Sequence, residues 1–166
     1  SGTSFDPILE VTYTVPPPVI IIDYAYDPSG QRVKYSNGTS AIYYPTKFYN
    51  VDSNTQNPTP ITKHIFSGSQ NIATIQGTGA NAKTYHNSTD LLNSSSIITD
   101  SAGATAETMD YYPFGSIRID NKVGSFTEQR KYIGQEFDTD TSLNYLNVRY
   151  YDSAKGQFIS QDPAYL

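Results

Sequence analysis

The stretch that decides the fold is Asn147-Val148-Arg149-Tyr150-Tyr151-Asp152, followed by Gly156-Gln157-Phe158-Ile159-Ser160 and then by Asp162-Pro163. Its β-branched and aromatic residues lie on both sides of a glycine, which predicts a strand, a turn and a second strand. Proline cannot donate a ladder hydrogen bond, so Asp162-Pro163 is expected to end the regular pairing. The stretch therefore predicts an antiparallel β-hairpin.

Turn signals of the same kind recur along the chain. Asp27-Pro28-Ser29-Gly30 is a type I turn sequence between two β-type runs, and Asn37-Gly38 is typical of a tight hairpin. An aspartate at such a turn accepts hydrogen bonds from backbone amides, and Asp138 is expected to do the same. The residues expected in structural turn roles are Asp27, Gly30, Asp100, Gly103, Asp152 and Gly156.

The composition favours strands over helices. The 166 residues include 15 tyrosines and no tryptophan, and the 11 glycines and 10 prolines are spread along the chain. A single hairpin is marginal in water, so recurring hairpins are expected to pair side by side. We therefore predict an all-β fold in which tandem antiparallel hairpins form a curved or spiralling sheet. A mean hydropathy of −0.49 suits a sheet that faces solvent and a wide cavity.

Some segments carry more specific expectations. The apolar run Val19-Ile20-Ile21-Ile22 is expected to be a buried strand. The polar runs at 52–60 and 87–96 are expected to be loops. Helix is expected at most as a single turn, within Ala102 to Met109 or Asp90 to Asn93.

Charge and composition argue against several classes of function. A net charge of −5, a pI near 4.8 and the lack of a basic cluster argue against nucleic acid or an anionic membrane as a partner. The chain has no cysteine, so it has neither a disulfide nor a thiolate zinc site. His64 and His86 are expected at the surface, and Asp138 with Asp140 lacks the continuation of a calcium loop. No apolar run approaches the ~18 residues of a membrane span, and no cofactor or metal is expected.

Several motifs resemble Rhs/YD-repeat proteins, in the order in which that family carries them. Tyr26-Asp27-x-x-Gly30-x-Arg32 matches the YD repeat, and Ser160-x-Asp162-Pro163 resembles part of the Rhs repeat-associated core domain. The other matching blocks are Ile42 to Pro45, Lys63 to Gly68, Asp110 to Gly115, Tyr132 to Asp138 and Leu143 to Asp152. The resemblance implies an N-terminal segment or boundary at 1–15, YD-repeat hairpins at 16–60, and a core domain at 61–166 that stops before a second Asp-Pro motif.

The chain departs from the family pattern at 88–94, where two family histidines are absent and Asn93 stands in place of a glycine. Asparagine visits the left-handed backbone region more readily than most residues. Asn93 can therefore stand in place of the glycine if this position needs a left-handed conformation.

The resemblance implies a secreted or surface-displayed β-shell that encloses or presents a C-terminal polypeptide, often a toxin. The implied partners are the remainder of that shell and its cargo. Family members release the cargo by self-cleavage with aspartic-protease chemistry, in which two carboxylates share a proton. By position, Asp162 matches the first catalytic aspartate and Arg149 matches a family arginine, while the second aspartate would lie beyond Leu166. One carboxylate cannot form the dyad, so turnover is not expected within these residues.

Arg149 also has a structural interpretation. Strict alternation over 143–151 would put Tyr145, Asn147, Arg149 and Tyr151 on one face of a strand. There, Arg149 could stack on aromatic rings or pair with Asp152 or Asp162 to hold the hairpin.

Three classes of function remain open on the sequence alone. The first is a structural segment of the shell, the second is an incomplete self-cleaving protease core, and the third is a carbohydrate-binding or adhesion module built on exposed tyrosines. An isolated piece of a spiral sheet has unpaired edges. We expect such an edge either to pair with a second copy or to be covered by residues 5–15.

Overall fold

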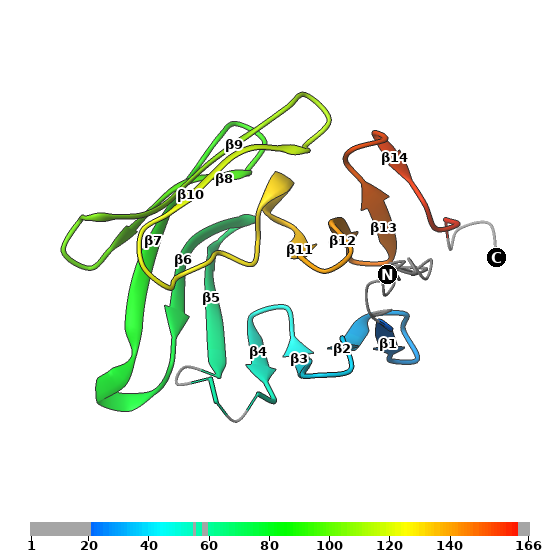
Figure 1. Cartoon of the computed structure of the whole chain (residues 1–166), viewed down its shortest axis with the longest axis horizontal. Helices are drawn as coiled ribbons and strands as arrows, with labels where there is room; N and C mark the ends of the chain where they lie inside the picture. The colour runs from blue at the N-terminus through cyan, green and yellow to red at the C-terminus, as the bar shows by residue number, and fades with distance from the viewer. Residues whose placement is uncertain (1–20, 55, 58–59, 163–166) are drawn as a thin grey trace, which may run out of the picture.

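The computed structural model describes residues 21–54, 56–57 and 60–162, and these residues form two antiparallel β-sheets (Figure 1). The first sheet has ten strands, paired in the order in which they occur along the chain. Its strands are β1 (Asp23–Tyr26), β2 (Arg32–Ser36), β3 (Ala41–Thr46), β4 (Tyr49–Asp52), β5 (Ile61–Ser67), β6 (Gln70–Gln76), β7 (Lys83–Thr89), β8 (Ser95–Asp100), β9 (Thr105–Tyr111) and β10 (Ile117–Lys122). We call this sheet the wall.

The second sheet is a four-stranded meander. Its strands are β11 (Glu136–Asp138), β12 (Leu143–Leu146), β13 (Arg149–Asp152) and β14 (Gln157–Phe158). Two short 3-10 helices, η1 (Gly79–Asn81) and η2 (Tyr132–Gly134), complete the regular elements of the described residues. None of these residues forms a helix of the length and apolarity needed to cross a bilayer.

The wall curves, as Figure 1 shows, and the chain after β10 turns back across it before it forms the second sheet. The prediction of tandem antiparallel hairpins in a curved sheet is confirmed. Each strand pairs with the next one in the sequence, because a short turn brings two consecutive strands side by side.

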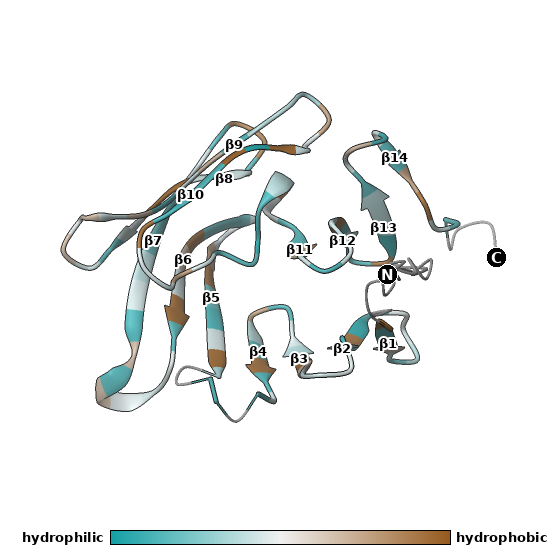
Figure 2. Cartoon of the chain, viewed as in Figure 1, coloured by the Kyte–Doolittle hydropathy of each residue, from teal (hydrophilic) through white to brown (hydrophobic). Residues whose placement is uncertain are grey.

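The apolar core is small and lies at one end of the wall. Tyr85, Ile98, Ala106, Met109 and Phe126 form the buried hydrophobic cluster, and the rings of Tyr85 and Phe126 stack with centroids 3.7 Å apart. Figure 2 shows hydrophilic and hydrophobic residues mixed along the strands. Apolar burial therefore accounts for one end of the wall, and polar contacts hold the rest.

The hairpin turns lie where the sequence has its Asp/Gly signals. Gly30, Gly38, Gly103 and Gly156 all have positive φ, between 68° and 82°, in the turns after β1, β2, β8 and β13. Asn93 has a φ of 67°, so this position is left-handed and suits an asparagine in place of the family glycine.

The prediction of one continuous strand over 143–151 is wrong. Leu146 and Arg149 are opposite each other in the ladder between β12 and β13, and the chain reverses through Asn147 and Val148. Asn147 has a φ of 61°, a conformation that suits a tight hairpin turn. The alternation of polar and apolar residues continues through Asn147 and Val148, so the pattern alone did not indicate a turn there.

Other local predictions are also corrected. Much of 87–96 is strand, since β7 ends at Thr89 and β8 begins at Ser95, and only 90–94 is a turn. The side-chain amide of Asn87 donates a 2.8 Å hydrogen bond to the Ser95 hydroxyl across these two strands. Residues 105–111 form β9 and not a helical turn. Ile21, which is 66% exposed, and Ile22 precede β1 instead of forming a buried strand. Val19, Ile20 and the segment 5–15 lie outside the described residues. The loop predicted at 52–60 is confirmed where it is described, since β4 ends at Asp52 and β5 begins at Ile61.

Candidate functional site

A single segment crosses the wall transversely and buries four charged residues, Glu128, Lys131, Glu136 and Asp138. We call residues 126–140 the strap (Figure 1, the yellow to orange chain before β12). Its main contacts with the wall are Phe126 on Tyr85 of β7, Glu128 with Thr74 of β6, Gln129 with Asn50 of β4, Arg130 with the carbonyl of Lys47, Lys131 with Glu107 of β9, and Asp138 with Arg32 of β2. The strap therefore ties together strands that are far apart in sequence.

Glu128 is the most deeply buried acid of the strap. Its Oε2 accepts a 2.6 Å hydrogen bond from the Thr74 hydroxyl, and its Oε1 accepts one from the backbone amide of Arg130 at 3.0 Å. Burial raises the pKa of Glu128 to about 7, because removal from water disfavours the charged form more than these two bonds favour it. Glu128 therefore changes its charge near neutral pH.

His64 of β5 lies beside Glu128, with Nδ1 3.8 Å from Oε1. The expectation of a surface position is wrong for this residue, because only 2% of His64 is exposed. Burial lowers the pKa of His64 to about 3, so the ring is neutral at pH 7 and does not compensate the carboxylate. His86 is exposed, as expected.

Lys131 joins two carboxylates at the β9–β10 end of the wall. Its Nζ lies 2.9 Å from Oε1 of Glu107 and 3.0 Å from Oδ2 of Asp120 on β10. Burial raises the pKa of Glu107. The pKa of Asp120 is lowered, because its hydrogen bonds with Glu107 and Lys131 outweigh its partial burial. One cation therefore serves two acids in a largely buried position.

Arg32 and Asp138 form a buried ion pair at the opposite end, between β2 and β11. The guanidinium Nη1 lies 2.5 Å from Oδ2 of Asp138, and both side chains are almost fully buried. The same guanidinium packs over the rings of Tyr44 and Tyr145, at 4.7 Å and 4.5 Å from their centroids. The carboxylate of Asp138 thus binds Arg32 instead of capping a turn, and its backbone carbonyl accepts the turn amide of Ser142.

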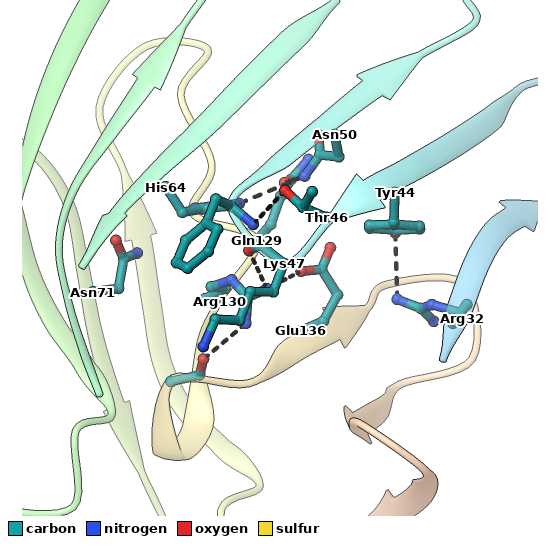
Figure 3. A network of polar contacts seen from close by, with 12 residues as sticks. Arg32, Tyr44, Thr46, Lys47, Asn50, His64, Asn71, Gln129, Arg130 and Glu136 are labelled. Atoms are coloured by element: carbon teal, nitrogen blue, oxygen red, sulfur yellow. Dashed lines mark hydrogen bonds and ion pairs between the residues drawn. The ribbon is translucent and has the colours of Figure 1, made fainter. Parts of the chain in front are cut away.

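Arg130 and Glu136 of the strap lie close to each other (Figure 3). Arg130 donates to the carbonyls of Lys47 at 3.0 Å and Gly134 at 3.3 Å, and its Nη2 is 3.9 Å from Oε2 of Glu136. Oε2 of Glu136 is buried and has no hydrogen-bond partner among the described residues. Burial raises the pKa of Glu136 even though the two neighbouring arginines oppose that change.

The two residues that the family resemblance singles out are close together. Nη1 of Arg149 lies 2.8 Å from Oδ2 of Asp162, and the Arg149 guanidinium packs over Phe158 at 3.8 Å from the ring centroid. About a third of each side chain is exposed, at 31% and 35%. Arg149 therefore both stacks on an aromatic ring and holds Asp162.

The turn aspartates make local contacts. Oδ1 of Asp27 accepts hydrogen bonds from the amides of Ser29 and Gln31 at 2.8 Å and 2.9 Å. Oδ1 of Asp100 accepts from Ala102 and Ala104, both at 2.9 Å. Asp152 accepts from the amides of Ala154 and Lys155 at 3.0 Å and 3.2 Å. No set of three His, Cys, Asp or Glu side chains in the described part of the chain is arranged to hold a metal ion.

Sequence analysis did not find the strap or its buried acids. The only local signal was that Glu128, Glu136 and Asp138 fall within 11 residues that also hold Arg130 and Lys131. Such a run usually indicates a solvated, charged segment. The partners that bury these residues are distant in sequence, as Thr74 is 54 residues from Glu128.

Comparisons with known proteins agree with this fold. No family model matches the chain. The double-stranded DNA deaminase toxin A of Burkholderia cenocepacia is 27% identical over 136 residues, which cover 80% of this chain and 9% of that protein. The tRNA nuclease WapA of Bacillus subtilis is 29% identical over 145 residues, which cover 84% of this chain and 6% of that protein.

Among solved structures, the crystal structure of TcdB2-TccC3 without its hypervariable C-terminal region matches with a TM-score of 0.70 at 20% identity. The match covers 85% of this chain and 8% of that chain. The chain therefore spans less than a tenth of each of these three proteins. It has the fold of a stretch of the TcdB2-TccC3 polypeptide.

Proposed function

We propose that this chain is a wall segment of an Rhs/YD-repeat β-shell that encloses a C-terminal polypeptide of the same protein. The hairpins at 16–60 would continue the repeat-built wall, and 61–166 would form the core-domain end of it. Such a shell would be secreted or displayed at the cell surface. The ten-stranded curved sheet, paired in chain order, is the observation that carries the proposal.

The two relatives support this function because their names give them different activities. One is a DNA deaminase toxin and the other is a tRNA nuclease, yet each matches 80% or more of this chain. A segment shared by proteins with different catalytic activities is better suited to carry or house a toxic domain than to be that domain. The shared segment is also a small part of each protein, as expected for one piece of a large wall.

The contacts of the strap support a structural role for this segment in such a wall. A curved sheet with little apolar core needs transverse contacts to keep its curvature. The strap provides them through two buried ion pairs, one between Lys131 and Glu107 on β9 and one between Asp138 and Arg32 on β2. A partner removed from such a pair leaves a buried charge, which costs about 3–5 kcal/mol.

Protease protection in the full-length polypeptide that contains this segment tests the proposal. The C-terminal polypeptide should resist trypsin in the wild type and in Lys155→Met, which removes an exposed ion pair with Asp152. It should be digested much faster in Lys131→Met, because the buried Glu107 then loses its cation and Asp120 keeps only the more exposed Lys122. If the wild-type C-terminal polypeptide is digested as fast as the same polypeptide expressed alone, it is not enclosed and the proposal fails.

The contact between Arg149 and Asp162 favours self-cleavage as a second candidate function. At 2.8 Å, the guanidinium holds the Asp162 carboxylate in one position, as an acid pair that acts on a nearby bond requires. The full-length polypeptide should then release a C-terminal fragment, and Asp162→Asn should abolish the release. Asp152→Asn is the matched control and should leave release unchanged. Equal fragment yields from wild type and Asp162→Asn would refute this role. No contact of the described residues favours the carbohydrate-binding alternative.

A further inference from the structure

A lysine and two acids meet where the strap passes β9 and β10. Nζ of Lys131 lies 2.9 Å from Oε1 of Glu107 and 3.0 Å from Oδ2 of Asp120. The carboxyl groups of Glu107 and Asp120 also hydrogen-bond to each other. One amine therefore contacts two carboxyl groups that are themselves linked by a hydrogen bond.

The burial of this group sets it apart from an ordinary ion pair. The side chains of Glu107 and Lys131 are 0% and 3% exposed, and the side chain of Asp120 is 21% exposed. Lys131 is the only buried lysine in the part of the chain that the structure describes. Its Nζ also lies 3.5 Å from Sδ of Met109, which belongs to the buried hydrophobic cluster. Such surroundings penalise separate charges and limit the access of water.

Contacts outside the group hold the reacting atoms in place. Asp120 is opposite Met109 in the ladder between β9 and β10, so the two acids come from paired strands. Oε2 of Glu107 accepts a 2.6 Å hydrogen bond from the backbone amide of Glu128, which leaves Oε1 for Lys131. Cγ of Asp120 is bonded to the oxygen that Nζ contacts, so the amine is close to the ~3–3.5 Å at which oriented groups react.

The chemical properties of the three groups are complementary. An amine that loses a proton is a nucleophile, and a carboxyl group that gains a proton can lose its hydroxyl as water. Burial raises the pKa of Glu107, so its carboxylate is a stronger base than an exposed one and suits the transfer of protons between the other two groups. Condensation also replaces a buried ion pair by a neutral amide, which removes the desolvation penalty of two charges.

We propose that Lys131 and Asp120 form an intramolecular isopeptide bond, with Glu107 as the group that transfers the proton. Nζ first gives one proton to the Asp120 carboxylate, and the neutral amine then attacks Cγ. Glu107 accepts a second proton from Nζ as the N–C bond forms. It passes this proton to the hydroxyl of Asp120, the C–O bond breaks, and one water molecule leaves. The amide nitrogen keeps the third proton, so the step needs no oxidant or other co-reactant.

Such a bond fastens the strap to the edge of the wall. β10, which carries Asp120, is the last strand in the order of the ten-stranded sheet. The chain has no cysteine, so a disulfide cannot make this connection. The bond depends only on the packing of the strap against β9 and β10, and it forms whether or not the wall encloses another polypeptide.

Peptide mapping of the full-length polypeptide that contains this segment tests the proposal. After denaturation and digestion with trypsin, mass spectrometry should find a branched peptide in which 119–122 is joined to 131–149. Its mass should equal the two peptides less one water molecule, and fragmentation should place the link between Asp120 and Lys131. Trypsin should not cut after Lys131, because an acylated lysine has no charge. A wild-type digest that contains only linear peptides overturns the proposal, and this result does not depend on the folding of any variant.

Three variants separate the proposed chemistry from simple contact. Lys131→Arg keeps the positive charge but replaces the amine by a guanidinium that stays protonated, so it should give only linear peptides. Glu107→Gln should lower the yield of branched peptide at least about tenfold, because it removes the group that transfers the proton. Lys122→Arg is the matched control: Nζ of Lys122 is 3.4 Å from Oδ2 of Asp120, but its side chain is 41% exposed, so the branched peptide should persist. An undiminished yield in Glu107→Gln would refute the role of Glu107.

Lys155 and Asp152 provide an internal control in the same digest. Nζ of Lys155 lies 2.7 Å from Oδ2 of Asp152, but the Lys155 side chain is 64% exposed. The peptide 150–155 should therefore end at Lys155 and keep its full mass. Loss of water from this peptide as well would show that contact alone is sufficient, which contradicts the role given to burial. Protection of the C-terminal polypeptide from protease is a separate measurement, so failure of this proposal and failure of the shell function are distinguishable.

Discussion

The acids at the hairpin turns and the acids of the strap carry the same chemical group in opposite environments. At the turns, Asp27 and Asp152 face solvent, and hydrogen bonds from Ser29 and Lys155, respectively, lower the pKa of each carboxyl. In the strap, burial raises the pKa of Glu128 and Glu136. The turn acids accept hydrogen bonds within one hairpin. The strap acids bind residues of strands that are far away in the sequence, so they connect several hairpins. Mutations in the two sets should therefore change stability by different amounts.

The largest expected effect comes from removal of a buried counter-ion. Arg32→Met should lower the free energy of unfolding by about 3–5 kcal/mol, because Asp138 is left charged and unpaired in a buried position. Urea denaturation measures this. Lys155→Met is the control, since its ion pair with Asp152 is exposed and its loss should not move the midpoint detectably. Similar midpoints for both variants would mean that burial does not distinguish the strap from the turns.

The next effect is a pH dependence with a definite sign. The pKa of Glu128 is about 7 in the folded chain against an ordinary value of 4.5, so the folded state binds more protons between these values. Its contribution to stability is complete below pH 4.5 and is lost as pH rises to about 7, a decrease of about 3 kcal/mol.

Unfolding measured from pH 4 to pH 8 in wild type and Glu128→Gln checks this sign. The variant keeps an oxygen that accepts from Thr74 but cannot ionise, so its stability should fall less over this range. The other buried acids remain in both proteins, and the difference between the two curves isolates Glu128. Parallel curves would contradict the assignment of a raised pKa to this residue.

The contrast between turns and strap also explains how much of the molecule could be predicted. The hairpins were predictable because their determinants are local: Asp27 binds amides two and four residues away, and Gly30 supplies the positive φ of the same turn. The same short range made Asn147 ambiguous, since a two-residue turn leaves few signals in the sequence.

The strap could not be predicted because each of its determinants is a pair of distant residues. Arg32 is 106 residues from Asp138, and Asn50 is 79 residues from Gln129. In the sequence, Arg32 belongs to a repeat motif and Asp138 to a weak calcium pattern, and neither one indicates burial. The surface position predicted for His64 was wrong for the same reason, because the strap that buries it is distant in the sequence. Arg149 and Asp162 were singled out through a family motif, and the strand pattern also offered Asp162 as one of two partners for Arg149, which is the contact found at 2.8 Å.

The third effect compares two turns that differ only in whether they touch the strap. Gly103 has a φ of 82° and no atom near its missing Cβ, whereas Gly115 has a φ of 86° and its Cβ would overlap the ring of Tyr132. Both Gly→Ala changes cost about 1–2 kcal/mol for the left-handed backbone. Gly115→Ala should cost about 2 kcal/mol more, because the overlap displaces Tyr132. Thermal unfolding of both variants measures the difference, and equal costs would show that Tyr132 moves away freely.

The smallest effect tests whether charge matters at a turn. Oδ1 of Asp100 accepts two amide hydrogen bonds, and Asp100→Asn keeps an oxygen in that position while it removes the charge. Asp100→Ala should therefore lower the free energy of unfolding by about 1 kcal/mol, and Asp100→Asn by less than about 0.5 kcal/mol. In the strap the order of importance is reversed, because the charge of Asp138 is what holds Arg32. A loss for Asp100→Asn as large as that for Asp100→Ala would show that turn acids also act through their charge, and the distinction between the two sets of carboxylates would then rest on burial alone.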